Sequence, residues 1–113
     1  MHEMSLAEGV LQIIEESARV KNFQRVRRVV LEIGKLSAVE PDAMRFCFGA
    51  VMSGGIADGA ILDIVETEGQ GWCAQCACQV PLAAPYDACP HCGGYPVGVT
   101  SGDAMRVIEL EVE

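Results

Sequence analysis

Four of the six cysteines are arranged as two Cys-x₂-Cys pairs, a spacing that is typical of a metal site. Cys73 and Cys76 form the first pair, and Cys89 and Cys92 form the second after an interval of twelve residues. Each pair puts two sulfurs on one side of a tight turn. Two facing pairs therefore make a tetrahedral S₄ site, which suits Zn²⁺ at about 2.3 Å per bond. Because four thiolates fill every position, we expect the zinc to be structural rather than catalytic.

The remaining cysteines and the histidine between the ligands are predicted to lie outside this site. A fifth donor has no place in a tetrahedron, so Cys78 is interpreted as a free thiol and His91 as pointing outward. Cys47 is expected to be a small buried hydrophobe in a helix. A thiol oxidoreductase using Cys76 and Cys78 is an alternative, but it requires an exposed thiol of low pKa, and zinc would occupy Cys76.

The second group with metal chemistry is the start of the chain, Met1-His2-Glu3. A bulky second residue should leave Met1 in place, so its α-amine, the His2 amide nitrogen and the His2 imidazole can close fused chelate rings. The amide or carboxylate of Glu3 is within reach as a fourth donor. Planar, nitrogen-rich ligation favours Ni(II) or Cu(II) over zinc. Read alone, however, His2 is simply a residue at a frayed terminus.

Helical periodicity from Ser5 to about Lys21 predicts the element that follows this start. Ser5 and Glu8 form a capping-box pattern, which predicts that the helix begins at Ser5 and that Met1–Met4 is a short arm. The residues expected on the apolar face of this helix are Leu6, Val10, Ile13, Ile14 and Ser17.

The other elements predict an α/β (α+β) fold in which two helices pack on a small sheet. Strands are expected at 26–33 and 60–67, and a second helix is expected from Pro41 to about Met52. The last strand, 105–112, should return to the same sheet with Ile108, Leu110 and Val112 on its buried face.

The segment from Gly69 to Gly102 differs sharply in composition. It holds four of the five prolines and five of the six cysteines. It has little apolar periodicity, so we expect no conventional core there and a metal in its place. The sequence therefore predicts an α/β domain of residues 1–68 plus 104–113, and an inserted zinc-binding domain of residues 69–103.

Charge and hydropathy narrow the classes of partner. The formal net charge is −8, and the only basic cluster, Arg25, Arg27 and Arg28, lies at the start of a predicted strand. A nucleic-acid partner is therefore disfavoured, because it requires clustered basic residues. The sequence has no run of about 18 apolar residues, so no segment is predicted to span a membrane. The start lacks the pattern of a secretory signal, which favours a cytoplasmic protein with metal-bound or free cysteines.

Three segments in this order carry a resemblance to a known family: Met1-His2-Glu3-Met4-Ser5, Gly34-Lys35-Leu36-Ser37 after a strand, and the four-cysteine pattern. The ending, Ser101-Gly102-Asp103 followed by an alternating strand, is also similar. Together they resemble the HypA/HybF family, nickel metallochaperones of nickel–iron hydrogenase maturation.

The resemblance implies an α/β nickel-binding domain with an inserted zinc domain, and His2 as a nickel ligand. It also implies two partners, the nickel-handling GTPase HypB and the precursor of the hydrogenase large subunit. Family members are carriers rather than enzymes, and we expect a monomer or a weak homodimer. The alternative from another class is a zinc-ribbon adaptor that binds only proteins.

Overall fold

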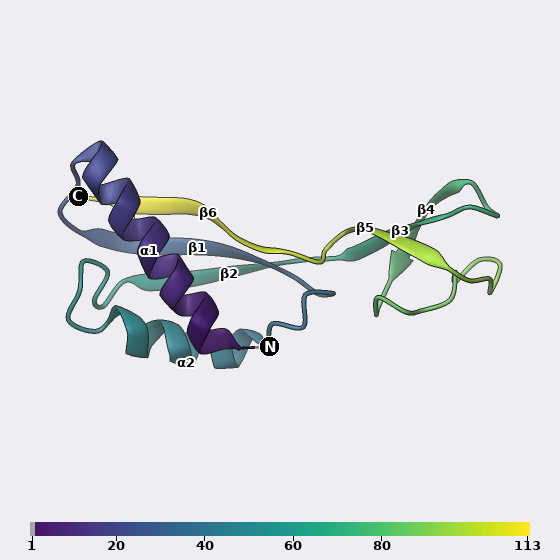
Figure 1. The fold of residues 1–113 in the computed structure, drawn as a ribbon, viewed down its shortest axis with the longest axis horizontal. Coiled ribbons are helices and arrows are strands. Elements are labelled where there is room, and N and C mark those ends of the chain that lie inside the picture. The colour runs from purple at the N-terminus through teal and green to yellow at the C-terminus, as the bar shows by residue number, and fades with distance from the viewer. Residues whose placement is uncertain (1) are drawn as a thin grey trace.

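The computed structural model describes residues 2–113, which form two small sheets joined end to end (Figure 1). The molecule is elongated, with principal extents of 52 × 25 × 17 Å. One sheet has the strand order β2-β1-β6 and carries both helices, and the other has the order β4-β3-β5. The elements are α1 (Glu3–Lys21), β1 (Val26–Gly34), α2 (Pro41–Met52), β2 (Ile61–Thr67), β3 (Gly69–Cys73), β4 (Cys78–Leu82), β5 (Val97–Ser101) and β6 (Met105–Val112). Two helices with small sheets confirm the predicted α+β class.

The central strand β1 organises the first sheet. It runs parallel to β2, with α2 as the crossover between them, and antiparallel to β6. Val29, Leu31 and Ile33 alternate along β1 and are buried in the core beneath the helices. The helix α2 begins at Pro41, also as predicted, and buries Met44 and two further apolar residues toward the same core.

The predicted start of the first helix is wrong. The helix begins at Glu3, with His2 as its N-cap residue, and the first helical hydrogen bond runs from the Leu6 N–H to the His2 carbonyl at 3.1 Å. Ser5 therefore lies inside the first turn rather than capping it. The acidic residue in the first turn, Glu3, suits the positive end of the helix dipole and allows this earlier start.

The predicted apolar face of α1 is also rotated in the structure. Ala7, Val10 and Ile14 are the buried residues, whereas Ile13 is 48% exposed. Spacings of three and four residues link the buried set, so the helix turns Ile13 toward the edge of the sheet.

The predicted buried face of the last strand is only partly correct. The register of β6 shifts between the pair Val30–Glu109 and the pair Leu31–Val107, which leaves Ile108 without a partner on β1. This irregularity reverses the alternation, as one extra residue in a strand must. Residues on the core side are Met105, Val107 and Leu110, while Ile108 and Val112 are 44% and 41% exposed.

The prediction that the cysteine-rich segment has no core is wrong as well. Its three antiparallel strands enclose a small apolar cluster. Leu36, which follows β1, packs among these residues from outside the segment. The members of the cluster are Leu36, Cys73, Val80, Leu82, Cys89 and Val97.

Glycines allow the two sheets to meet closely. A Cβ atom on Gly34 would overlap the Gly102 carbonyl, and Gly102 itself has a φ of +83°. The Leu36 N–H donates to the same Gly102 carbonyl at 2.8 Å, and Lys35 forms an ion pair with Glu68 nearby. The junction is therefore a hydrogen-bonded contact of backbone on backbone, which a side chain at either glycine would disrupt.

The last strand, β6, pairs with β1 in the first sheet, and the segment between β2 and β6 forms a sheet of its own. That residues 1–68 plus 104–113 and residues 69–103 fold as separate domains stays a prediction, and the Cys89 variant discussed below tests it. No helix within residues 2–113 has the length and apolar character needed to cross a membrane.

Candidate metal centre

Two tight turns bring the four predicted zinc ligands together. Cys73 ends β3 and Cys76 lies in the turn toward β4, while Cys89 and Cys92 lie in the long connection that precedes β5. The four sulfurs lie within 4.8 Å of one another, and no other group of potential metal ligands is found among residues 2–113.

Residues that follow the second cysteine of each pair make these turns possible. Gly93 has a φ of +71°, and its N–H donates to the Cys89 carbonyl at 2.8 Å. In the other turn the equivalent residue is Ala77, with a φ of +51°. An alanine in this conformation costs about 1–2 kcal/mol. The turn that holds Cys73 and Cys76 is therefore strained, whereas glycine keeps the turn that holds Cys89 and Cys92 free of this strain.

The spacing of the sulfurs fits a tetrahedral ion. Four bonds of about 2.3 Å to a central ion require sulfurs about 3.8 Å apart. The Sγ atoms of Cys73 and Cys92 are 3.7 Å apart, and those of Cys76 and Cys89 are 3.9 Å apart. The donor set fills a tetrahedron and leaves no open position for a water or a substrate.

Electrostatics also favour a cation at this point. The N–H groups of Cys92 and His91 are directed at the Cys89 sulfur and lower the pKa of Cys89 to about 6. Contacts with the Cys92 and Cys73 thiols raise the pKa of Cys76 to about 12. One thiolate thus suppresses ionisation of its neighbour, and a divalent cation relieves this conflict by stabilising every thiolate at once.

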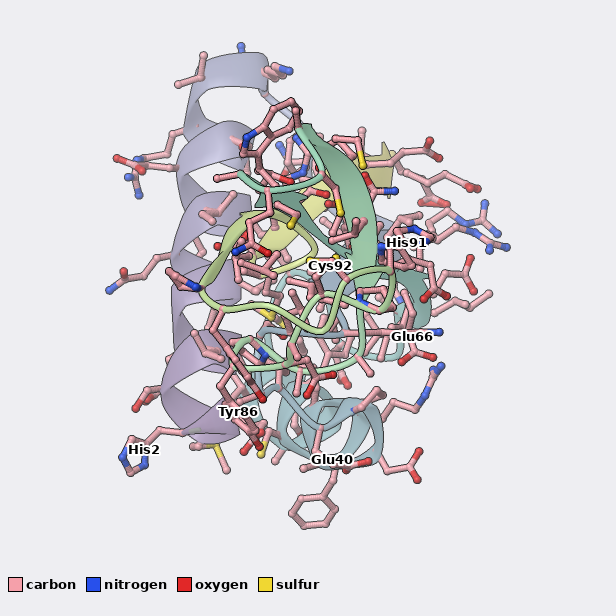
Figure 2. The ribbon with its side chains drawn as sticks, turned by 90° about the vertical axis from the view of Figure 1, so that its right-hand side faces the viewer. His2, Glu40, Glu66, Tyr86, His91 and Cys92 are labelled. Carbon is pink, nitrogen blue, oxygen red and sulfur yellow. The ribbon has the colours of Figure 1, made fainter. Side chains whose placement is uncertain are left out.

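The three residues predicted to lie outside the site do not join the cluster. Cys78 begins β4 opposite Cys73 and is exposed. His91 is exposed as well, and Figure 2 shows it beside Cys92 on the surface of the second sheet's loops. Cys47 is half-buried on α2 and packs against the core of the first sheet.

The predicted nickel residues lie elsewhere in the molecule. His2 is exposed at the start of α1, and in Figure 2 its imidazole points away from the body of the protein, well apart from His91 and Cys92. Met1 lies outside the described residues. Neither site therefore shares a ligand with the other among residues 2–113.

A contact that the sequence did not predict fixes the start of α1. The Glu40 N–H, just before α2, donates to the Glu3 carboxylate at 3.1 Å and lowers the pKa of Glu3. The carboxylate of Glu40 in turn accepts from the Ala43 N–H at 2.7 Å and caps α2. Glutamate before proline is a weak local signal for the cap, but nothing in the sequence reveals its contact with Glu3, which is 37 residues away.

Comparisons with known proteins agree with this arrangement. The family model described as "Hydrogenase/urease nickel incorporation, metallochaperone, hypA" matches residues 1–112. The hydrogenase maturation factors HypA of Dechloromonas aromatica and Azotobacter vinelandii are 58% and 53% identical to this chain, each over the full length of both proteins.

A solved structure agrees at the level of fold. The solution structure of the nickel metallochaperone HypA from Helicobacter pylori matches with a TM-score of 0.74 at 30% identity, covering 99% of this chain and 97% of that one. These descriptions are of a metallochaperone and maturation factor, not of a catalytic enzyme. The predicted resemblance is confirmed, and the chain belongs to the HypA family of hydrogenase/urease nickel-incorporation metallochaperones.

Proposed function

We propose that this protein is a cytoplasmic nickel carrier that binds Ni(II) at its N-terminus and delivers it to the large-subunit precursor of a nickel–iron hydrogenase. The observation that carries the proposal is the exposed His2 at the first turn of α1. Family membership supports nickel as the cargo. Ligand exchange from an exposed site requires no catalytic group, so the protein acts as a carrier and not as an enzyme.

Helix geometry supports backbone nitrogen as a nickel donor. The first four N–H groups of a helix have no intrahelical acceptor, so deprotonating the amides of His2 and Glu3 breaks no helical hydrogen bond. The Glu3 carboxylate already accepts a hydrogen bond from the Glu40 N–H, which favours the Glu3 amide as the fourth donor. The proposed set is the Met1 amine, the His2 imidazole and the two amide nitrogens.

Charge favours the same set. The positive end of a helix dipole repels a bare divalent cation. Two deprotonated amides cancel the +2 charge of Ni(II), so a complex with these ligands meets no net repulsion. A planar arrangement of four nitrogens also matches the known geometric preference of Ni(II).

The four-cysteine cluster is proposed to hold zinc. Sulfurs only 3.7 and 3.9 Å apart can share one ion, and tetrahedral sulfur ligation of a single ion suits zinc. When bound, zinc would stabilise the folded second sheet. Four sulfur ligands would leave it no open coordination position for a reaction. Cys73, Cys76, Cys89 and Cys92 would hold it.

Partners are proposed to be proteins of nickel insertion: the GTPase HypB and the hydrogenase precursor. A nucleic-acid partner stays disfavoured, because the basic residues on β1 are already neutralised. Arg28 contacts Asp63 and lies 3.4 Å from Glu111, and Arg27 lies 3.0 Å from Glu113. Acidic neighbours of this kind repel phosphate.

A cellular experiment tests delivery. A strain that carries His2→Ala should make hydrogenase large subunit that lacks nickel, and activity should recover partly when external nickel is raised, as expected when a carrier is bypassed. Nickel content of the purified large subunit and hydrogenase activity are the measurements. His91→Ala, which changes the other histidine, is the matched control and should behave like wild type.

Wild-type hydrogenase nickel in the His2→Ala strain, at limiting external nickel, would contradict delivery through His2. It would leave the zinc-ribbon adaptor as the better interpretation.

A further inference from the structure

Three apolar residues that the sequence pattern predicts to be buried are exposed at one place. Ile13 on α1 and Ile108 and Val112 on β6 are 48%, 44% and 41% exposed. All three line one hollow of about 380 Å³ between the second half of α1 and β6. Phe23, Val107 and Leu110 complete its apolar wall, and its polar lining residues are Ser17, Lys21 and Glu109. Such a concentration of exposed apolar surface marks an interaction site more often than chance.

The strand beside this hollow has an open edge. β6 pairs with β1 on one side, and no other strand within residues 2–113 pairs with it on the other. The opposite edge of the sheet is different, because the Arg45 guanidinium on α2 donates to the Leu62 carbonyl of β2 at 3.1 Å. An uncovered edge offers backbone N–H and C=O groups to an incoming strand.

The chemistry along β6 specifies the side chains of such a strand. Glu109 and Glu111 point to the sheet face away from the helices, since Val107 and Leu110 point to the core. Glu111 lies near Arg28, whereas Glu109 forms no ion pair within residues 2–113. Successive side chains of an added strand would point to opposite faces of the sheet. Every second side chain would lie beside these glutamates, and the others would lie over the hollow.

We propose that the β6 edge and its hollow bind an extended segment of a partner protein in which basic and apolar side chains alternate. Backbone hydrogen bonds to β6 give affinity, and alternate side chains give specificity. The basic residues lie opposite Glu109 and Glu111, and the apolar residues contact Ile13, Ile108 and Val112. A second copy of this chain fits less well, because its β6 brings two glutamates and only one basic residue, Arg106, which already forms an ion pair with Glu32.

This docking site lies at the opposite end of α1 from His2. Helical rise puts Ser17, on the rim of the hollow, about 21 Å from Glu3 along the helix. A partner held at β6 therefore leaves the N-terminal residues accessible, so recognition of the partner and binding of nickel use different surfaces. The inference does not depend on the identity of the cargo.

A peptide experiment tests the proposal. The probe is a seven-residue peptide of alternating lysine and valine, titrated into the full-length zinc-loaded protein and followed by calorimetry and by NMR amide shifts. It should bind one per chain and shift the amides of β6 and of residues 13–21. Two control peptides separate the causes: one replaces lysine by glutamate, and one keeps every lysine but replaces valine by proline, which cannot pair as a strand.

Point variants locate the site. Glu109→Lys and Ile108→Lys should each weaken binding of the lysine–valine peptide by about tenfold or more, by reversing the charge or by placing a charge in the hollow. Ile61→Lys is the matched control, because Ile61 is 54% exposed on the other edge strand and should leave the affinity unchanged. All three variants should bind Ni(II) as the wild type does, so a failure here is distinct from a failure of the nickel proposal.

Three results would overturn the proposal. The first is equal binding of the valine and proline peptides, which would reduce the effect to charge. The second is an equal loss of affinity in Ile61→Lys. The third is a homodimer of the protein alone that Ile108→Lys dissociates, which would assign the β6 edge to a second copy of the chain.

Discussion

Replacing Cys89 by serine is expected to remove the zinc and to unfold residues 69–103, while the helices and the first sheet stay folded. Cys89 is buried at the centre of the small cluster in the second sheet, so its loss removes a ligand and a packed side chain together. Metal binding supplies folding free energy on the order of 10 kcal/mol in modules of this kind. The four aliphatic side chains of that cluster cannot replace such a contribution.

The chain offers separate signals for its two parts. Trp72 is the only tryptophan and lies on β3, so its fluorescence reports the second sheet. Both helices belong to the first sheet's core, so helical circular dichroism reports the other part. Cys78→Ser is the matched control, since Cys78 is exposed and lies outside the sulfur cluster.

In Cys89→Ser we expect no bound zinc and an altered Trp72 signal, with helical dichroism close to wild type. A variant that kept full zinc would contradict the S₄ assignment. Loss of both signals together would contradict the division into residues 1–68 plus 104–113 and residues 69–103.

Extending the chain before Met1 by two residues, glycine and serine, is expected to abolish high-affinity nickel binding. The extension converts the α-amine into an amide, which removes one nitrogen donor and breaks the chelate ring that it closes. Nickel titration followed by its absorption spectrum measures the effect. The same two residues added after Glu113 are the control and should change nothing. An extended protein that bound nickel normally would exclude the amine as a ligand.

Local pattern predicts much of the first sheet. One face of β1 is buried, so its residues alternate between apolar and polar, and this local alternation is enough to predict the strand. In the same way, Pro41 before an apolar run is enough to predict the start of α2. The two Cys-x₂-Cys turns are similar: each depends on a few residues and on a glycine or alanine at positive φ. Their sulfurs lie together as the spacing suggests.

Features that depend on distant partners could not be predicted in this way. Nothing within β6 reveals the irregularity at Ile108, because the shift is defined only by its pairing with β1. Leu36 enters the core of the second sheet from a loop far earlier in the chain. The Glu40 contact fixes Glu3 and starts α1 earlier than the Ser5 pattern predicts. In each case a tertiary contact outweighs the local signal.

The central claim is nickel binding through His2, and a nickel titration of wild type and His2→Ala tests it most directly. Each zinc-loaded protein is titrated with Ni(II), unbound metal is removed, and nickel and zinc per chain are measured. Wild type and the control His91→Ala should each hold one nickel and one zinc, and His2→Ala should hold zinc alone with an unchanged fold. A His2→Ala protein that bound one Ni(II) as tightly as wild type would contradict the claim.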